Sequence, residues 1–260
     1  MAVVPEDGEW RIENGGALES ASVLHHPSSL AQSMTETAPN PELLGSLSRL
    51  VRGLSALFWG LPAALVICVQ TAKGEWFEKF GIVPPLAATF LLFYGLGLLG
   101  YFQKQERIWR AALERAKVFS LINVGLSPFL YWWSRMPSQP FYNSMIELMM
   151  LSGLLFLFAL NPVLWRLAAM LPDETLRLET KLFTTINRYF IVGTMGLLFA
   201  YYILTRSHQL PPVILNFLFL LERTGVWLAL FMVLLPVATT MALIWKIKET
   251  ILISVFGPEH

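Results

Sequence analysis

The sequence predicts an all-α integral membrane protein with six transmembrane helices, arranged as three parallel helix-pair repeats with both termini in the cytoplasm. Of the 260 residues, 55% are hydrophobic and 14% are charged, whereas soluble domains carry about 25% charge. Three stretches, 53–72, 80–103 and 224–245, contain no Asp, Glu, Lys or Arg. Each can cross a hydrocarbon core of about 30 Å, which takes roughly 20 helical residues. The composition therefore excludes an ordinary water-soluble globule.

Residues 1–45 are predicted to be a mobile acidic cytoplasmic tail. Seven acidic residues in this segment stand against Arg11 alone, and the run 15–41 is rich in Ser, Thr, Pro and Gly. A segment with few apolar residues and a high net charge cannot build a packed core. We expect a six-helix transmembrane domain over 46–255 and a short C-terminal tail over 256–260.

The apolar runs and their flanking residues give the order of the helices. The six spans are predicted at 50–71, 84–103, 118–134, 145–167, 186–205 and 224–245. Proline stands where each returning helix begins, a position at which its missing N–H costs nothing. Tryptophans fall near the span ends, where an indole prefers the membrane interface, as at Trp109, Trp132, Trp133, Trp165 and Trp245.

The charge distribution predicts the orientation. With the N-terminus inside, thirteen Lys and Arg residues of the helical domain lie on the inner side and five on the outer side. Basic residues favour cytoplasmic loops. Both termini are therefore predicted to be cytoplasmic, in a membrane of the bacterial inner-membrane type.

Two segments beside the spans have more than one interpretation. Residues 103–117 contain no Gly or Pro and are predicted to continue the second span as a cytoplasmic helix. Its apolar face, which carries Trp109 and Leu113, either lies against the bundle and the headgroups or docks a partner. A single helix from Pro211 to Trp245 would measure about 52 Å, which is more than the thickness of the bilayer. Residues 211–221 therefore span the membrane with the rest of the helix, project from its outer side, or form a separate segment that re-enters it.

An internal repeat is predicted from two matching segments. Residues 117–123 and 181–187 share the pattern Lys, aliphatic, Phe, Ser or Thr, any residue, Ile, Asn, at a spacing of 64 residues. Both begin an outward-going span from the cytoplasmic side. Units with the same topology are related by an axis along the membrane normal, which makes the chain three helix pairs with a diverged first pair.

Small residues in two spans predict close helix contacts. Gly95, Gly97 and Gly100 lie in the second span, and Gly193 and Gly196 lie in the fifth. Small side chains let the backbones of membrane helices approach one another.

Four polar residues within or near the spans are the candidate site residues. Glu147 lies among apolar neighbours near the outer end of the fourth span, and Asn123, Asn161 and Asn187 lie in apolar helices. An ionisable group inside a membrane marks a functional site unless it reaches water or a cation such as Arg135. Amides in this setting bind a ligand or, more commonly, form hydrogen bonds between helices.

The sequence disfavours metal, cofactor and enzymatic chemistry. The four histidines, His25, His26, His208 and His260, lie outside the spans, so a haem or redox-metal centre within the bundle lacks its usual ligands. Motifs of metalloproteases, serine hydrolases and phosphate-binding loops are absent from the sequence. We expect no catalytic residue, no metal and no cofactor.

The expected function is that of a non-catalytic structural or accessory subunit of a multi-component membrane complex. Its partners would be the lipid bilayer and other membrane subunits, with no nucleic acid. A small-solute transporter or channel, with a central path between the three helix pairs, is the alternative, and needs polar groups at the midplane. A lipid-modifying enzyme is a third possibility, and needs an interfacial cluster of His, Ser or carboxylate residues.

Overall fold

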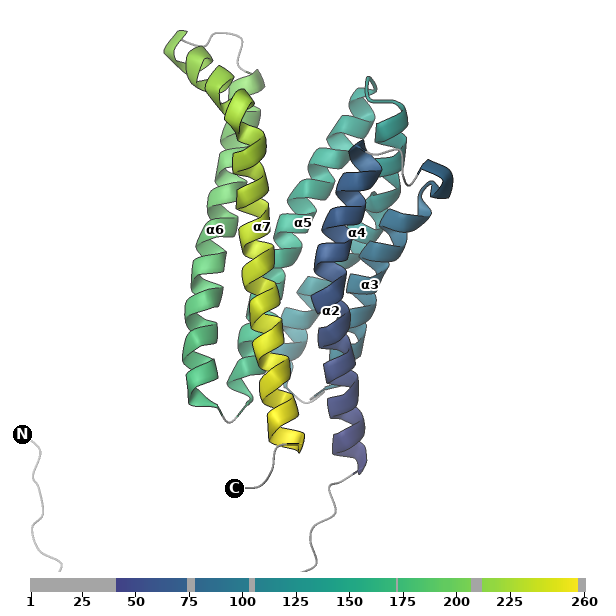
Figure 1. The fold of residues 1–260 in the computed structure, drawn as a ribbon, viewed down its shortest axis with the longest axis vertical. Coiled ribbons are helices and arrows are strands. Elements are labelled where there is room, and N and C mark those ends of the chain that lie inside the picture. Colours follow the sequence, from purple (N-terminus) through teal and green to yellow (C-terminus); the bar gives the residue numbers. More distant parts are fainter. Residues whose placement is uncertain (1–40, 74–77, 103–105, 172, 207–211, 257–260) are drawn as a thin grey trace, which may run out of the picture. The chain divides into compact units, whose positions relative to one another are not determined.

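The computed structural model describes residues 41–73, 78–102, 106–171, 173–206 and 212–256, and every regular element in these ranges is a helix (Figure 1). The elements are α2 (Pro41–Lys73), the 3-10 helix η1 (Glu78–Phe80), α3 (Val83–Leu99), α4 (Arg107–Arg135), α5 (Pro140–Ala169), α6 (Glu174–Arg206) and α7 (Pro212–Phe256). The all-helical prediction is confirmed for these ranges. Most of the predicted acidic tail and the tail from 257 onward lie outside the described residues, and α2 already begins at Pro41.

Four helices are long and apolar enough to cross a membrane: Gly45–Lys73, Pro140–Ala169, Glu174–Leu204 and Phe231–Ile253. Helix α3 is apolar but has 17 residues, about 26 Å at 1.5 Å per residue. Helix α4 carries Ser120, Asn123 and Ser127 in its uncharged part. The described part of the chain is therefore all-helical and contains four helices that could span a membrane, whereas the six predicted spans stay a prediction.

The segment before the third predicted span belongs to α4 and does not extend α3, contrary to the prediction. Helix α3 ends at Leu99, and the backbone N–H of Gly100 donates to the carbonyl of Gly97. Helix α4 begins at Arg107, so its first turns carry the amphipathic stretch. Leu113 is buried there, and the indole of Trp109 is 0% exposed in the core, although an interfacial position was predicted for it. The apolar face therefore packs against the protein's own bundle.

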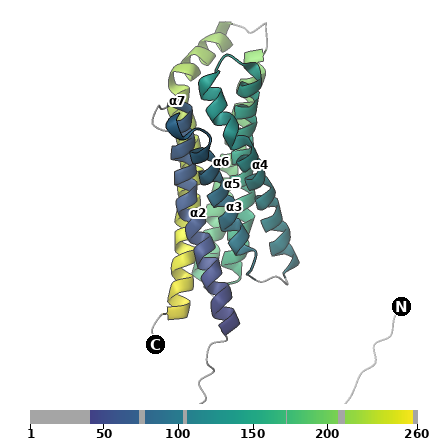
Figure 2. The same ribbon diagram turned by 90° about the vertical axis from the view of Figure 1, so that its right-hand side faces the viewer.

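Helix α7 is one continuous helix of 45 residues, about 67 Å long. It begins at Pro212, and its N-terminal end turns away from the line of the remainder in both views (Figures 1 and 2). Residues 212–221 are thus a continuation of α7, whereas residue 211 lies outside the described part. Helix α5 likewise runs without interruption from Pro140 through Glu147.

Successive helices run in alternating directions and pack side by side, and α2 also contacts α4 and α7 (Figures 1 and 2). Helix α5 contacts α4, α6 and α7. The first turns of α2, α4 and α6 and the last turns of α3, α5 and α7 meet at one end. This end carries Arg49, Arg110, Arg166 and Lys246, and is called the basic end.

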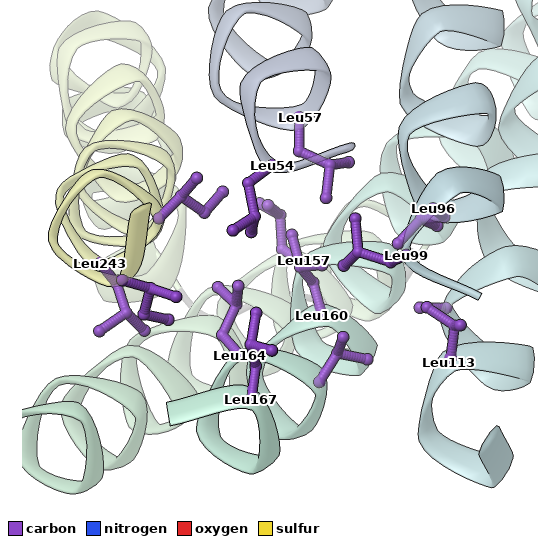
Figure 3. Close-up of a cluster of buried hydrophobic side chains, with 14 of the residues drawn as sticks. Leu54, Leu57, Leu96, Leu99, Leu113, Leu157, Leu160, Leu164, Leu167 and Leu243 are labelled. Carbon is purple, nitrogen blue, oxygen red and sulfur yellow. The ribbon is translucent and has the colours of Figure 1, made fainter. Parts of the chain in front are cut away.

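Among the side chains that the structure describes, most of the buried apolar cluster belongs to the half of the bundle next to the basic end. Figure 3 shows part of this cluster. Helix α2 contributes leucines at successive spacings of four, three and four residues, which is the period of one helix face. These are Leu50, Leu54, Leu57 and Leu61. They belong to one cluster with leucines of α3, α4, α5 and α7. Figure 3 shows Leu54 and Leu57 together with Leu96, Leu113, Leu160 and Leu243 of this cluster.

The glycine predictions divide between two helix pairs. Helices α2 and α3 cross closely, because a Cβ at Gly53 would lie 2.9 Å from the carbonyl oxygen of Gly95. A Cβ at Gly193 or Gly196 of α6 would meet nothing within 4 Å. Close contact is confirmed at Gly95. A Cβ at Gly97 of α3 would also meet nothing within 4 Å, so the contact predicted at Gly97, Gly193 and Gly196 is wrong for the part of the chain that the structure describes.

Candidate functional site

Asn187 of α6 joins three helices through its side-chain amide. Its Nδ2 donates to Oδ1 of Asn161 on α5 at 3.0 Å and to Oγ1 of Thr240 on α7 at 3.0 Å. All three side chains are buried. We call Asn161, Asn187 and Thr240 the amide cluster. It links the three helices through buried side-chain hydrogen bonds.

Two polar atoms of the amide cluster have no hydrogen-bond partner among the described residues, Nδ2 of Asn161 and Oδ1 of Asn187. One is a donor and the other an acceptor. Burying such an atom unpaired costs about 1–3 kcal/mol. The cluster therefore keeps the capacity to bind one small polar group, such as a water molecule.

A proline interrupts the backbone hydrogen bonds of α5 and of α7 beside the amide cluster. Pro162 directly follows Asn161, and Pro236 lies four residues before Thr240. Each proline lacks the N–H that would bond the carbonyl one turn earlier. The Thr240 hydroxyl in turn donates to the carbonyl of Pro236 at 2.7 Å. The side chains of the cluster thus sit where α5 and α7 are locally weakened.

Asn123 forms a second buried polar contact, between α4 and α5. Its Nδ2 donates to the backbone carbonyl of Ser152 at 3.4 Å, and the Ser152 hydroxyl donates to Oδ1 of Asn123. Ser152 and Asn161 lie nine residues apart, about two and a half turns, so they occupy opposite sides of α5. Helix α5 therefore uses one polar residue toward α4 and another toward α6 and α7.

The two asparagines of the predicted repeat take comparable places. Asn123 and Asn187 are both buried, and each donates to a side chain or carbonyl of the helix that follows it. Buried positions of α4 recur in α6 at the same offset, as at Ala116 and Thr180. An internal repeat would produce this agreement between the buried positions of α4 and α6. The repeat itself stays a prediction.

Glu147 does not join these clusters. Its side chain is exposed on α5, beside exposed Leu148, Met150 and Leu151. None of the hydrogen bonds or ion pairs found among the described residues involves it. The carboxylate therefore faces the surroundings of the bundle.

Charged groups near the basic end connect α6 to α7 and cap its N-terminus. Lys246 of α7 pairs with Glu179 of α6. Oδ1 of Asp173 accepts hydrogen bonds from the Thr175 hydroxyl at 2.7 Å and from the backbone N–H groups of Thr175 and Leu176. The Thr175 hydroxyl, followed by the Leu176 N–H, lowers the pKa of the Asp173 carboxyl. Asp173 thus caps the N-terminus of α6 as an anion.

Ser152 and Thr240 are the polar partners that the sequence reasoning missed. Serine and threonine are common in membrane helices, where most donate to a carbonyl of their own helix, as Thr194 does to Phe190. The spacing of Ser152 from Asn161 was the available signal, since it places polar groups on both sides of one helix. Nothing local singles out Thr240.

The described residues contain no group of three or more His, Cys, Asp or Glu side chains that could hold a metal ion. Comparisons of the chain with models of known protein families, with curated proteins and with solved structures gave no match.

Proposed function

We propose that the chain is a non-catalytic structural or accessory subunit of a membrane complex, in a membrane of the bacterial inner-membrane type with both termini cytoplasmic. The observation that carries the proposal is the exposed carboxylate of Glu147 on α5, next to exposed Leu148, Met150 and Leu151. Placing an ionised carboxylate against lipid hydrocarbon raises the free energy of the protein unless the group reaches water or pairs with a cation. A partner helix that carries Lys or Arg would supply that cation.

The position of Glu147 along α5 makes such a contact geometrically reasonable. Helix α5 has 30 residues, about 45 Å, against a hydrocarbon core of about 30 Å. Glu147 lies seven residues after Pro140, about 10 Å from the start of the helix. It therefore lies close to the boundary of the hydrocarbon, on the side away from the basic end.

Exposed apolar side chains also lie at the corresponding ends of α5 and α6, away from the basic end. No described side chain is buried in the part of α5 before Ser152 or in the part of α6 after Thr194. Phe199 of α6 is 66% exposed and Phe141 of α5 is 55% exposed. Lipid covers such surfaces in any membrane protein. The carboxylate among them is the feature that favours a protein partner over lipid alone.

Purification in a mild detergent tests the proposal. We expect a stable partner of fixed stoichiometry to remain with the wild-type chain and to be lost from Glu147→Gln, which keeps the size of the side chain and removes its charge. Glu174→Gln is the matched control, because Glu174 is exposed at the basic end, and it should keep the partner. A wild-type chain that migrates alone would contradict the proposal.

A transporter or channel is the second candidate, and the unpartnered atoms of the amide cluster favour it. Asn161 Nδ2 and Asn187 Oδ1 could contact a small polar solute between α5, α6 and α7. Reconstitution in liposomes would then give solute flux that Asn187→Leu abolishes and Glu147→Gln does not. If Glu147→Gln abolished flux while the complex stayed intact, the account of the chain as a subunit without transport would be wrong.

A further inference from the structure

Two adjoining cavities open at the junction of α3 and α4, near the basic end. The first has a volume of about 280 Å³ and is lined by Gly100, Arg110, Leu113, Glu114 and Lys117. The second has a volume of about 420 Å³ and runs along α3, where its lining includes Phe90, Tyr94, Gly97 and Leu98. Gly100 and Lys117 line both. We call the two cavities together the α3–α4 groove.

The ammonium group of Lys117 lies between the polar and the apolar part of the α3–α4 groove. A Cβ added at Gly100 would lie 2.9 Å from Lys117 Nζ, so the missing side chain makes the room for this group. No hydrogen bond or ion pair of Lys117 is found among the described residues.

The charge around this ammonium group is positive. Arg110 lines the same cavity, and Arg49 of α2 stacks on the ring of Tyr101, which lines the other, at 5.1 Å. The one carboxylate in the lining is Glu114, whose contact with Arg110 is long at 3.8 Å and solvent-exposed. An exposed ion pair of this kind contributes little free energy to stability, so it holds Arg110 only weakly. The groove thus offers cations to an anion without a strong competing carboxylate.

The apolar part of the groove fits a hydrocarbon chain. Phe90 and Tyr94 are 53% and 52% exposed, one turn apart on α3, and Gly97 leaves open space, since a Cβ there would meet nothing within 4 Å. Basic pockets between membrane helices on the cytoplasmic side bind anionic lipid headgroups. We propose that the α3–α4 groove binds one anionic phospholipid, with its phosphate at Lys117 and Arg110 and one acyl chain along α3.

Lipid binding to the purified full chain tests the headgroup contact. Native mass spectrometry in detergent, with phosphatidylglycerol or phosphatidylcholine added, gives the bound fraction of each. We expect Lys117→Gln to weaken phosphatidylglycerol binding about fivefold, the effect of one basic residue near an anionic lipid. Phosphatidylcholine binding should weaken less, because its choline cation offsets the charge of the phosphate. Lys181→Gln is the matched control, because Lys181 is exposed on α6 at the corresponding place of the predicted repeat. Arg110→Gln, at an exposed position, repeats the test if Lys117→Gln does not fold.

The acyl contact has its own variant. Gly97→Leu fills open space in the groove and should lower the binding of both lipids, whereas Gly193→Leu, on the open face of α6, should not. The proposal is overturned if Lys117→Gln and Arg110→Gln bind phosphatidylglycerol like the wild type, or if the controls lose as much. It is also overturned if millimolar inorganic phosphate displaces the lipid and Gly97→Leu has no effect, because the groove would then be a phosphate site.

Discussion

At the scale of single residues, the buried amides show what a polar side chain does in an apolar helix bundle. Asn187 reaches two other helices at once, and Asn123 reaches one. An interhelical hydrogen bond in a membrane is worth about 0.6–2 kcal/mol, less than the core leucines contribute together. Its main effect is on the rotation of each helix about its axis, because only one rotation brings the amide to its partners.

Replacing Asn187 tests the amide cluster as a structural element. Asn187→Ala removes two hydrogen bonds and leaves the Asn161 carbonyl oxygen without a donor, so the free energy of unfolding should fall by about 1–3 kcal/mol. Thr185→Ala is the control on the same helix, since Thr185 is exposed and bonds the carbonyl of Lys181, and should change little. Unfolding in mixed micelles measures both. Equal stabilities would mean that the cluster does not hold the helices together.

Asp173 gives a pH-dependent contribution to stability. Its folded pKa is lowered, first by the hydrogen bond from Thr175, from the ordinary value of 3.8. The stabilisation is therefore complete above about pH 5 and is lost as the pH falls through the lowered folded value. Asp173→Asn keeps a capping oxygen without the charge. The stability difference between wild type and variant should shrink between pH 5 and pH 3, and a difference independent of pH would contradict this assignment.

At the scale of elements, the sequence predicted the apolar helices but not every boundary. The apolar runs appear in α2, α3, α5, α6 and α7, because long charge-free stretches fix what is helical in a membrane. The stretch after Gly100 was assigned to the wrong helix, since its helix-forming residues suit either neighbour. What decides is the packing of Trp109 and Leu113 into the core, a tertiary contact that local propensity does not contain.

The same limit applies to glycines, and it yields a paired prediction. Gly53→Ala should destabilise the protein by about 1–2 kcal/mol, because overpacking outweighs a gain of about 1 kcal/mol in helix propensity. A Cβ there would lie 2.4 Å from Leu99 Cδ1 and 2.9 Å from the Gly95 carbonyl oxygen. Gly193→Ala meets open space and should be neutral or slightly stabilising. Thermal unfolding of the two variants in detergent measures the contrast, and a reversed order would place the close crossing elsewhere.

At the scale of the whole molecule, the packing is uneven in a way that composition does not reveal. Both halves of the bundle contain long apolar stretches, yet among the side chains that the structure describes the buried leucines gather near the basic end, while Phe141, Phe199 and Glu147 remain exposed toward the other. Hydropathy records which residues avoid water, and lipid satisfies that requirement as well as protein does. The candidate residues could therefore be named from the sequence, whereas their partners and their exposure depended on the folded arrangement.

The distribution of charge along the same axis leads to the last prediction. The alternating helices bring Arg49, Arg110, Arg166 and Lys246 to one end, and the positive-inside rule predicts that this end faces the cytoplasm. On a background in which Cys68 is replaced by Ser, a cysteine at Ser138 should react with a membrane-impermeant reagent added to intact cells. A cysteine at Glu174 should react only after the membrane is opened. Both positions are exposed in the structure, so access to the reagent depends on the side of the membrane and not on burial. Inverted labelling would reverse the orientation, and would move the proposed lipid site to the outer leaflet and the Glu147 contact to the inner one.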